Sequence, residues 1–407
     1  MAQTNKLKTF NDPIYGFIGT PNEFLYKLIA HPFVQRLRRI SQMGLSYLVY
    51  PGAHHTRFHH ALGSMHLMQR AIHILRYKGA EITIEEEKGL LAAILLHDIG
   101  HGPFSHALEH VLIPDKSHEH LSLVFMQFLN EQFDGQLEVA MQIFRGEHPK
   151  MFLNQLVSSQ LDMDRLDYLK RDSFYTGVTE GNISSERLIA MLNVHDNELV
   201  VEEKGLYSVE KFLMARRFMY WQVYLHKTGL VAELLLIKLM KRAKKLLEDG
   251  VSIGGSKNLL SFLTKGPNSF ETNHLIAFAG LDDIDIMASM KAWQQHDDFV
   301  LSNLSQRLLN RDLLKIKIKN APVDPEKIQP NKNWVKKNYD LSEDDANYFV
   351  FAGDISNQAY KSTDQVIKIL RKNGKLIDVA KASDHFNIEA LSSKVVKYYV
   401  CYPKESV

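Results

Sequence analysis

One apolar segment ends directly in two polar side chains, and this feature constrains the fold more than any other. Residues 90–96 form an unbroken run of leucine, alanine and isoleucine, and the next two residues are His97 and Asp98. A helix that is apolar all round has to be buried. The two glycines and the proline in residues 100–103 favour a helix end just after the pair. The sequence therefore predicts that His97 and Asp98 lie at the inner end of a buried helix.

Helical periodicity extends from Glu23 to about Gly250. Thr83 and Glu86 have the spacing of a capping box, which predicts a helix start ahead of the apolar run. An amphipathic stripe with steps of 3, 4 and 3 residues is formed by Met65, Met68, Ile72 and Leu75. Residues 162–172 and 208–239 are also expected to be helical. Spacings of four place Asp164, Tyr168 and Asp172 on one helix face, and Arg216, Tyr220 and Tyr224 on another.

The composition changes toward the C-terminus. Residues 348–351 and 395–400 are rich in β-branched and aromatic side chains, which favours strands, and a helix is expected near residues 364–371. We therefore predict a mainly α protein with a large helical bundle over residues 1–250, a helical extension over 251–330 and a smaller α+β C-terminal lobe over 331–407.

Composition argues against several classes of protein. A net charge of +2 over 407 residues does not suggest a nucleic-acid coat protein, and the basic residues 238–245 are expected to be a solvated helix face. Nucleic acid is thus an improbable partner. The only cysteine, Cys401, excludes an intrachain disulfide. The longest apolar run is far shorter than the ~20 residues of a membrane helix, and Glu233 interrupts the next, so we expect a soluble, cytoplasmic protein without a membrane partner.

Most of the 19 histidines fall between His54 and His120, which directs attention to metal binding. We predict that the metal ligands are His60, His97, Asp98 and Asp164. Mixed nitrogen and oxygen ligands suit a divalent ion. These ligands do not decide among Mn, Fe, Mg, Zn and Ni. Asp98 could bridge to a second ion because a carboxylate has two oxygens, so one or two ions are expected.

These four residues match the H…HD…D pattern of the HD phosphohydrolase superfamily. The longer segments around them give a closer match to one branch of this superfamily. Residues 51–60, 97–106 and 162–168 resemble the deoxynucleoside triphosphate triphosphohydrolases, in particular the animal SAM/HD-domain group and its bacterial relatives. The resemblance runs from about Phe10 to Leu230. Since it begins almost at the N-terminus, no SAM domain is expected before it.

The resemblance implies a reaction. A metal-activated hydroxide would attack the α-phosphorus of a deoxynucleoside triphosphate, which would yield the deoxynucleoside and inorganic triphosphate. His106 would lie nearest the leaving oxygen, His118 would help to protonate it, and His101 would contact phosphate or a second metal. The phosphate-gripping positions are matched by Arg57, Arg165 and Arg216.

The resemblance also implies contacts to the sugar. Gln42 and Asp172 match positions that bind the 3′-hydroxyl, and Tyr168 would pack on the ring. Met43 and Tyr224 match residues that crowd the 2′ position, which would exclude ribonucleotides by steric contact. Met43 departs from the more usual leucine, and its similar volume should preserve this exclusion.

Two other functions stay open. The metal ligands alone would allow an HD phosphohydrolase acting on a cyclic nucleotide, a monophosphate or guanosine tetraphosphate. A non-enzymatic nucleotide sensor or single-strand binder is the second alternative, although the chain lacks an interleaved basic and aromatic stripe.

A regulatory nucleotide is also expected. Asn11, Gln35 and Arg38 match the allosteric positions of the animal enzyme, whose site forms between subunits of a tetramer, so a homo-oligomer with tetramer favoured is implied. Ala30 stands where the family has an aspartate that accepts hydrogen bonds from guanine. Because alanine cannot accept them, dATP is favoured over GTP as the regulator.

Overall fold

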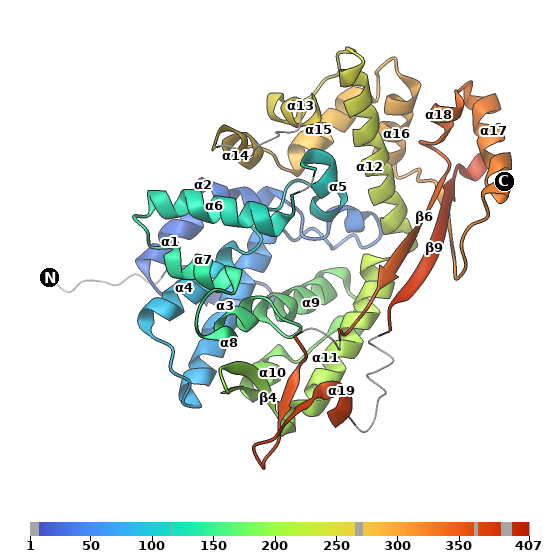
Figure 1. Ribbon diagram of the computed structural model, residues 1–407. Coiled ribbons are helices and arrows are strands. Elements are labelled where there is room, and N and C mark those ends of the chain that lie inside the picture. Colours follow the sequence, from blue (N-terminus) through green and yellow to red (C-terminus); the bar gives the residue numbers. More distant parts are fainter. Residues whose placement is uncertain (1–7, 115, 265–271, 362–364, 384–392, 407) are drawn as a thin grey trace.

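The computed structural model describes residues 8–114, 116–264, 272–361, 365–383 and 393–406. The helices up to the middle of the chain are α1 (Glu23–Ala30), α2 (Pro32–Gln35), α3 (Arg57–Tyr77), α4 (Ile84–Leu96), α5 (Ser105–Leu112), α6 (His118–Gln132), α7 (Glu138–Arg145), α8 (Met151–Val157), α9 (Met163–Thr176), α10 (Ser185–Met191), α11 (Leu206–Met219) and α12 (Lys227–Glu248). The later helices are α13 (Lys257–Thr264), α14 (Thr272–Ala279), α15 (Asp283–Trp293), α16 (Phe299–Leu309), α17 (Gln329–Tyr339), α18 (Glu343–Ala346) and α19 (Val379–Ala382). The described residues are thus mainly helical, as predicted (Figure 1).

The centre of the bundle is α3, which packs against both α4 and α9. The stripe of α3 that the sequence predicts is buried along its whole length, from Met65 to Leu75. Helix α4 begins with the expected capping box, in which Thr83 Oγ1 accepts from Glu86 N and Glu86 Oε2 accepts from Thr83 N. Its residues 89–96 are all buried, and His97 is its C-terminal cap. The apolar run therefore delivers His97 and Asp98 to the interior.

The strands are β1 (Thr9–Asp12), β2 (Gly16–Gly19), β3 (Leu192–His195), β4 (Glu198–Glu202), β5 (Lys315–Lys319), β6 (Phe351–Asn357), β7 (Lys368–Leu370), β8 (Leu376–Asp378) and β9 (Val395–Tyr402). They form the hairpin β1-β2, a four-stranded sheet in the order β3-β4-β7-β8 and a three-stranded sheet in the order β5-β9-β6. The predicted strand at 395–400 is confirmed as β9. The other predicted strand begins only at Phe351, where β6 starts.

The prediction of a helix near residues 364–371 is wrong. Residues 362–364 lie outside the described part of the chain, and Lys368–Leu370 form strand β7. This strand pairs in parallel with β4, from Val200 to Glu202, and antiparallel with β8. The hairpin turn to β8 contains Gly374, whose φ of +79° suits a glycine. Pairing with a distant strand overrides the local preference here.

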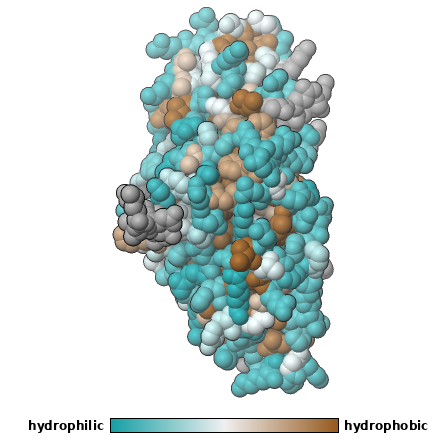
Figure 2. All heavy atoms as spheres, turned by 90° about the vertical axis from the view of Figure 1, so that its left-hand side faces the viewer, coloured by the Kyte–Doolittle hydropathy of each residue, from teal (hydrophilic) through white to brown (hydrophobic). Residues whose placement is uncertain are grey.

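The two larger sheets join segments that are far apart in the sequence. Strand β5 lies within the predicted helical extension, yet it pairs with β9 of the C-terminal part, and β7 pairs with β4 of the first 250 residues. The division at residues 250 and 330 stays a prediction. None of the helices in the described residues is long and apolar enough to cross a membrane. Figure 2 shows a face that is mostly hydrophilic, with apolar residues in scattered groups.

Candidate metal centre and active-site cavity

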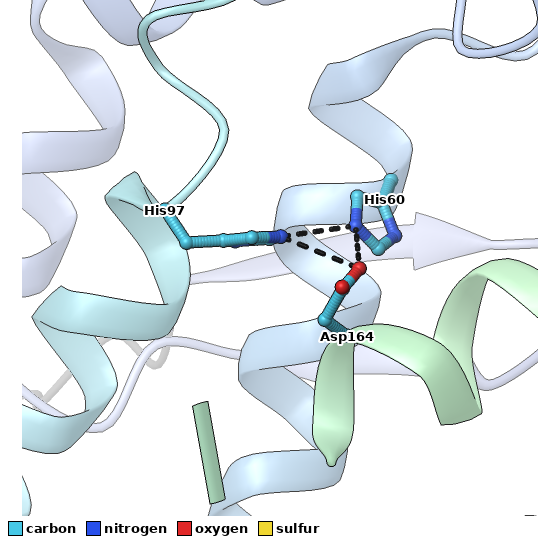
Figure 3. Close-up of side chains that lie close together, drawn as sticks. All are labelled: His60, His97 and Asp164. Carbon is cyan, nitrogen blue, oxygen red and sulfur yellow. Dashed lines mark hydrogen bonds and ion pairs between the residues drawn. The ribbon is translucent and has the colours of Figure 1, made fainter. Parts of the chain in front are cut away.

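Three helices bring three of the predicted metal ligands together. His60 lies in the first turn of α3, His97 caps α4 and Asp164 lies in the first turn of α9. The His60 Nε2 atom is 3.3 Å from His97 Nε2 and 3.1 Å from Asp164 Oδ1, and His97 Nε2 is 3.5 Å from that oxygen. The three side chains point toward one another (Figure 3). Two nitrogens and one oxygen at this spacing can share one divalent ion.

The far side of each imidazole is held by an acceptor. His60 Nδ1 lies 2.7 Å from Asp167 Oδ2, and His97 Nδ1 lies 2.6 Å from the carbonyl oxygen of Ile94. These contacts place the proton of each neutral ring on Nδ1 and leave the Nε2 lone pair directed at the shared centre, as in metal-ligating histidines. The residues present therefore fit a divalent ion.

The carboxylates around His60 raise its pKa. Burial alone would lower the pKa of His60, but hydrogen bonds to Asp164 and Asp167 raise it to about 10. The buried carboxylates therefore stabilise positive charge at this position, which a bound cation would also supply.

Asp98 lies between this centre and a second group of possible ligands. Its Oδ1 atom is 3.4 Å from His97 Nε2 and 3.4 Å from His101 Nε2, and Asp98, His101 and His118 form a second potential metal group. Its other oxygen, Oδ2, accepts a 2.5 Å hydrogen bond from Arg57 Nη1. Burial would raise the pKa of Asp98, but His97 and Arg57 hold it well below its usual value.

The two histidines of this second group are stacked on each other. The rings of His101 and His118 lie 3.9 Å apart between centroids. The loop after α4 packs so closely on the start of α6 that a Cβ on Gly100 would lie 2.2 Å from the carbonyl oxygen of His118. Burial lowers the pKa of His101 well below its usual value, with Arg57 as a further cause. Burial would also lower the pKa of His118, but a hydrogen bond to Glu109 raises it. Glu109 Oε1 lies 2.9 Å from His118 Nδ1. The neighbouring rings thus favour different protonation states.

A cavity of about 650 Å³ opens beside these residues. Its walls contain every substrate-contacting residue expected from the sequence, together with most of the expected metal and catalytic residues: Gln42, Met43, Arg57, His97, Asp98, His101, His118, Asp164, Arg165, Tyr168, Asp172, Arg216 and Tyr224. His60 is fully buried behind them. His106 lies in α5, and its side chain is outside the described part of the structure.

Two arginine side chains in the cavity wall have hydrogen-bond donors without a partner among the described residues. Arg165 follows Asp164 in α9 and donates to the capping residue Asp162. The Nε atoms of Arg165 and Arg216 are buried and have no hydrogen-bond partner among the described residues. Buried donors of this kind are rare without a ligand or water to accept from them. The cavity can therefore hold an anionic group.

The other polar cluster in the wall centres on Asp172. Its Oδ1 atom is 2.7 Å from His55 Nε2, and its Oδ2 accepts a 2.7 Å bond from the Tyr224 hydroxyl. Tyr224 ends a π-helical turn, Tyr220–Tyr224, which follows α11 and carries it to the same wall as Arg216. The expected common face of Arg216, Tyr220 and Tyr224 is therefore confirmed.

Sequence reasoning missed several residues that shape this site. Asp167 and His55 lie inside the motif segments, but only the fold shows that they hold His60 and Asp172. Glu109, which holds His118, carries no sequence signal. Glu233 in α12 appeared only as an interruption of an apolar run, yet it lines the cavity.

The expected regulatory residues lie elsewhere. Asn11 is exposed in β1, and Arg38 Nε donates to Gln35 Oε1 at 2.8 Å. The Arg38 guanidinium lies 3.7 Å from the centre of the Phe58 ring, and Gln35 Nε2 donates to the carbonyl of Ile29. Gln35 and Arg38 are thus brought together, and none of the three residues lines the cavity.

Comparisons with known proteins agree with this geometry. The chain matches the family model of the HD domain over residues 57–172 and that of the HD associated region over residues 183–252. The uncharacterized protein YwfO of Bacillus subtilis is 34% identical over 316 residues, which cover 76% of this chain and 71% of that protein.

Two further relatives are informative. The human deoxynucleoside triphosphate triphosphohydrolase SAMHD1 is 30% identical over 299 residues, which cover 63% of this chain and 47% of that protein. The crystal structure of a phosphohydrolase from Bacteroides thetaiotaomicron is 49% identical in sequence, with a TM-score of 0.95 over 98% of this chain and all of that one.

Proposed function

Since the chain belongs to the family of HD-domain phosphohydrolases, which are metal-dependent enzymes, we propose that it hydrolyses deoxynucleoside triphosphates to the deoxynucleoside and inorganic triphosphate. One observation carries the proposal. A single cavity combines the metal-ligand cluster, buried arginine donors without partners and the Asp172–Tyr224 pair. These are the three chemistries that a metal-bound nucleotide needs. The similarity to a human enzyme of this activity supports the choice of substrate.

In this proposal His60, His97, Asp98 and Asp164 would hold a divalent ion, and Asp98 together with His101 and His118 could hold a second one. A bound divalent ion would supply an acidified water and offset phosphate charge. Arg57 fixes Asp98 by its 2.5 Å hydrogen bond. The ion would be Mn, Fe, Mg, Zn or Ni, and the donor set suits several of them.

Arginines then bind the phosphates. A triphosphate carries about four negative charges, which guanidinium groups can bind through paired hydrogen bonds. Arg165 and Arg216 offer buried donors that no described residue accepts. Arg57 contributes positive charge next to Asp98 and completes this set.

The leaving 5′-oxygen needs a proton. Glu109 raises the pKa of His118 against the effect of burial and so favours its protonated form, in which His118 could donate a proton or stabilise the leaving group. His106 would be the nearer donor, as the family resemblance implies. His101, with its lowered pKa, acts as a neutral ring that contacts phosphate or a second ion.

The sugar is recognised by the Asp172 cluster. Gln42 and Asp172 would hydrogen-bond the 3′-hydroxyl, whose single O–H one of them would accept, and the Gln42 Oε1 atom is buried without a partner among the described residues. Met43 and Tyr224 would leave no room for a 2′-hydroxyl, and Tyr168 would pack on the ring. Steric contact of this kind excludes ribonucleotides.

Product analysis tests the function. Purified protein is incubated with each dNTP and rNTP and with added Mn, Mg or Fe, and the products are separated by ion exchange. Inorganic triphosphate and deoxynucleoside are expected from dNTPs. Release of orthophosphate or pyrophosphate, or turnover only of cyclic nucleotides, monophosphates or guanosine tetraphosphate, would contradict the proposal. Salt-dependent binding of single-stranded DNA without turnover would favour the non-enzymatic alternative.

We also propose regulation by a nucleotide that binds near Asn11, Gln35 and Arg38 in a homo-oligomer, with a tetramer favoured. Exposed Arg38 has a flat, always charged side chain that suits a phosphate or base. Alanine at position 30 favours dATP over GTP. Rates for one dNTP with and without a second nucleotide, together with sedimentation, test this. No response to any nucleotide and no change of oligomer would contradict it.

A further inference from the structure

Helix α12 places one carboxyl group in the cavity wall. Glu233 is the only polar side chain in residues 229–236, which otherwise consist of glycine, alanine, valine and leucine. Most of these neighbours are buried, including Ala232 and Leu236. Glu233 nevertheless lines the cavity. An acid in an apolar helix segment is costly to bury unless it meets a partner.

No hydrogen bond or ion pair links the Glu233 carboxyl to another residue in the described part of the chain. Burial is the single cause that raises its pKa to about 7. A Cβ placed on Gly44 would lie 3.8 Å from Glu233 Oε1, so the carboxyl faces the segment that also carries Gln42 and Met43. Its natural partner is therefore a group inside the cavity.

The surroundings indicate what that group is. Helix α12 contacts α5 and the turn Gly44–Leu48, and this wall contains Phe104, Ala107 and Leu225. One turn before Glu233, a Cβ on Gly229 would meet no atom within 4 Å, so this face of the helix leaves open space. A mainly apolar wall with one carboxyl is suited to an aromatic ring with polar edge groups.

We propose that Glu233 reads the edge of the nucleobase and favours guanine. This inference rests on the proposed function, in which Gln42 and Met43 contact the sugar. Because Gly44 follows them and faces Glu233, the group attached to the sugar lies within reach of the carboxylate. Guanine presents two adjacent donors, N1–H and N2–H, which match the two oxygens of a carboxylate. Adenine and cytosine pair one donor with one acceptor, and thymine flanks its single N3–H with two carbonyl oxygens.

The test compares base preference before and after removal of the charge. Values of kcat/KM for triphosphate release are measured for all four dNTPs at a pH about one unit above the Glu233 pKa. The wild-type protein should prefer dGTP to dTTP by about tenfold or more, as expected for a paired base contact. Glu233→Gln should reduce this ratio to about threefold or less, because the amide offers only one acceptor and sets a donor against guanine.

Matched variants separate base reading from other effects. Glu248→Gln makes the same change at an exposed position of α12 and should leave the ratio unchanged. Glu233→Asp keeps the charge on a shorter side chain and should retain a reduced preference for dGTP. It also serves as the deciding variant if Glu233→Gln does not fold, as judged by thermal unfolding.

The outcomes distinguish the inference from the function on which it rests. A wild-type protein that turns over no dNTP would overturn the proposed function and the inference together. Turnover of dNTPs without preference for dGTP, or a preference that Glu233→Gln leaves unchanged, would overturn only the inference. An equal loss of activity toward all four substrates in both Glu233 variants would assign Glu233 a structural role instead.

Discussion

Replacement of Asp167 by asparagine should weaken metal binding without touching a metal ligand. Asp167 is fully buried and accepts from His60 Nδ1 at 2.7 Å and from Arg171 Nε and Nη2 at 2.9 Å each. Burial would raise its pKa, but Arg171 and His60 lower it to about 2. Gly63 leaves the space that this carboxylate fills, since a Cβ there would lie 2.0 Å from Asp167 Oδ1.

The amide changes which nitrogen of His60 carries the proton. Its single oxygen can take the place of only one carboxylate oxygen, and its NH₂ group can only donate. With the amide oxygen at the Oδ1 position, Arg171 Nη2 keeps its acceptor, and the NH₂ group faces His60 Nδ1 and Arg171 Nε, which both contact Oδ2 in the wild type. If the NH₂ group faces His60, Nδ1 becomes an acceptor and the proton moves to Nε2, the atom directed at the metal. Loss of such an outer contact lowers metal affinity by about 10- to 100-fold. The weakened contacts to buried Arg171 should cost about 3–5 kcal/mol of unfolding free energy.

Metal titration by calorimetry and urea unfolding of the apo-protein measure the two effects separately. Asp12→Asn is the matched control, because Asp12 Oδ2 accepts from Arg171 Nη1 at 2.7 Å and has no contact with His60. It should lower stability and leave metal affinity within about threefold, since His60 keeps its acceptor. Wild-type metal affinity in Asp167→Asn, or an equal loss of affinity in both variants, would refute the reasoning.

Three further predictions follow from the site. His97→Ala should abolish hydrolysis and deplete bound metal, and full turnover with no metal in elemental analysis would contradict the ligand assignment. Tyr224→Ala should raise the ratio of kcat/KM for ATP over dATP by about tenfold, whereas Tyr224→Phe, which loses only the bond to Asp172, should still exclude ATP; equal ratios would argue against steric exclusion. Because burial raises the folded-state pKa of Glu233 to about 7 from 4.5, the folded protein binds the extra proton in this range, and stability should fall as the pH rises from 4.5 to 7. Relative to Glu233→Gln, the wild type should lose on the order of 2 kcal/mol over that window after allowance for solvent in the cavity, and parallel pH profiles in urea unfolding would contradict the burial argument.

Local spacing was enough to predict much of the site. The apolar run before His97 predicted a buried helix that ends at two of the proposed metal ligands, because a helix without a polar face has to lie in the interior. Spacings of four residues predicted that Asp164, Tyr168 and Asp172 share a face, and all three line the cavity. Both predictions depend only on the geometry of one helix, which the sequence specifies directly.

Contacts between elements were decided by the tertiary structure. Asp98 was predicted beside His60 and His97, but only the packing of α5 and α6 shows that it also faces His101 and His118. The pairing of His118 with Glu109 likewise follows from how the start of α6 lies against α5. Such contacts depend on helix crossing angles and distances, which arise from the packing of whole helix surfaces.

The same distinction holds for the strands and for Glu233. Residues 368–370 form a strand because residues 200–202 offer them a partner, and three residues carry too little local preference to decide this alone. In the sequence, Glu233 merely interrupts an apolar run. The sequence by itself determined which residues share a helix face and where the buried helix ends. Only the tertiary structure, which sets the wall of α12 against the segment of Gly44, made this carboxyl part of the cavity.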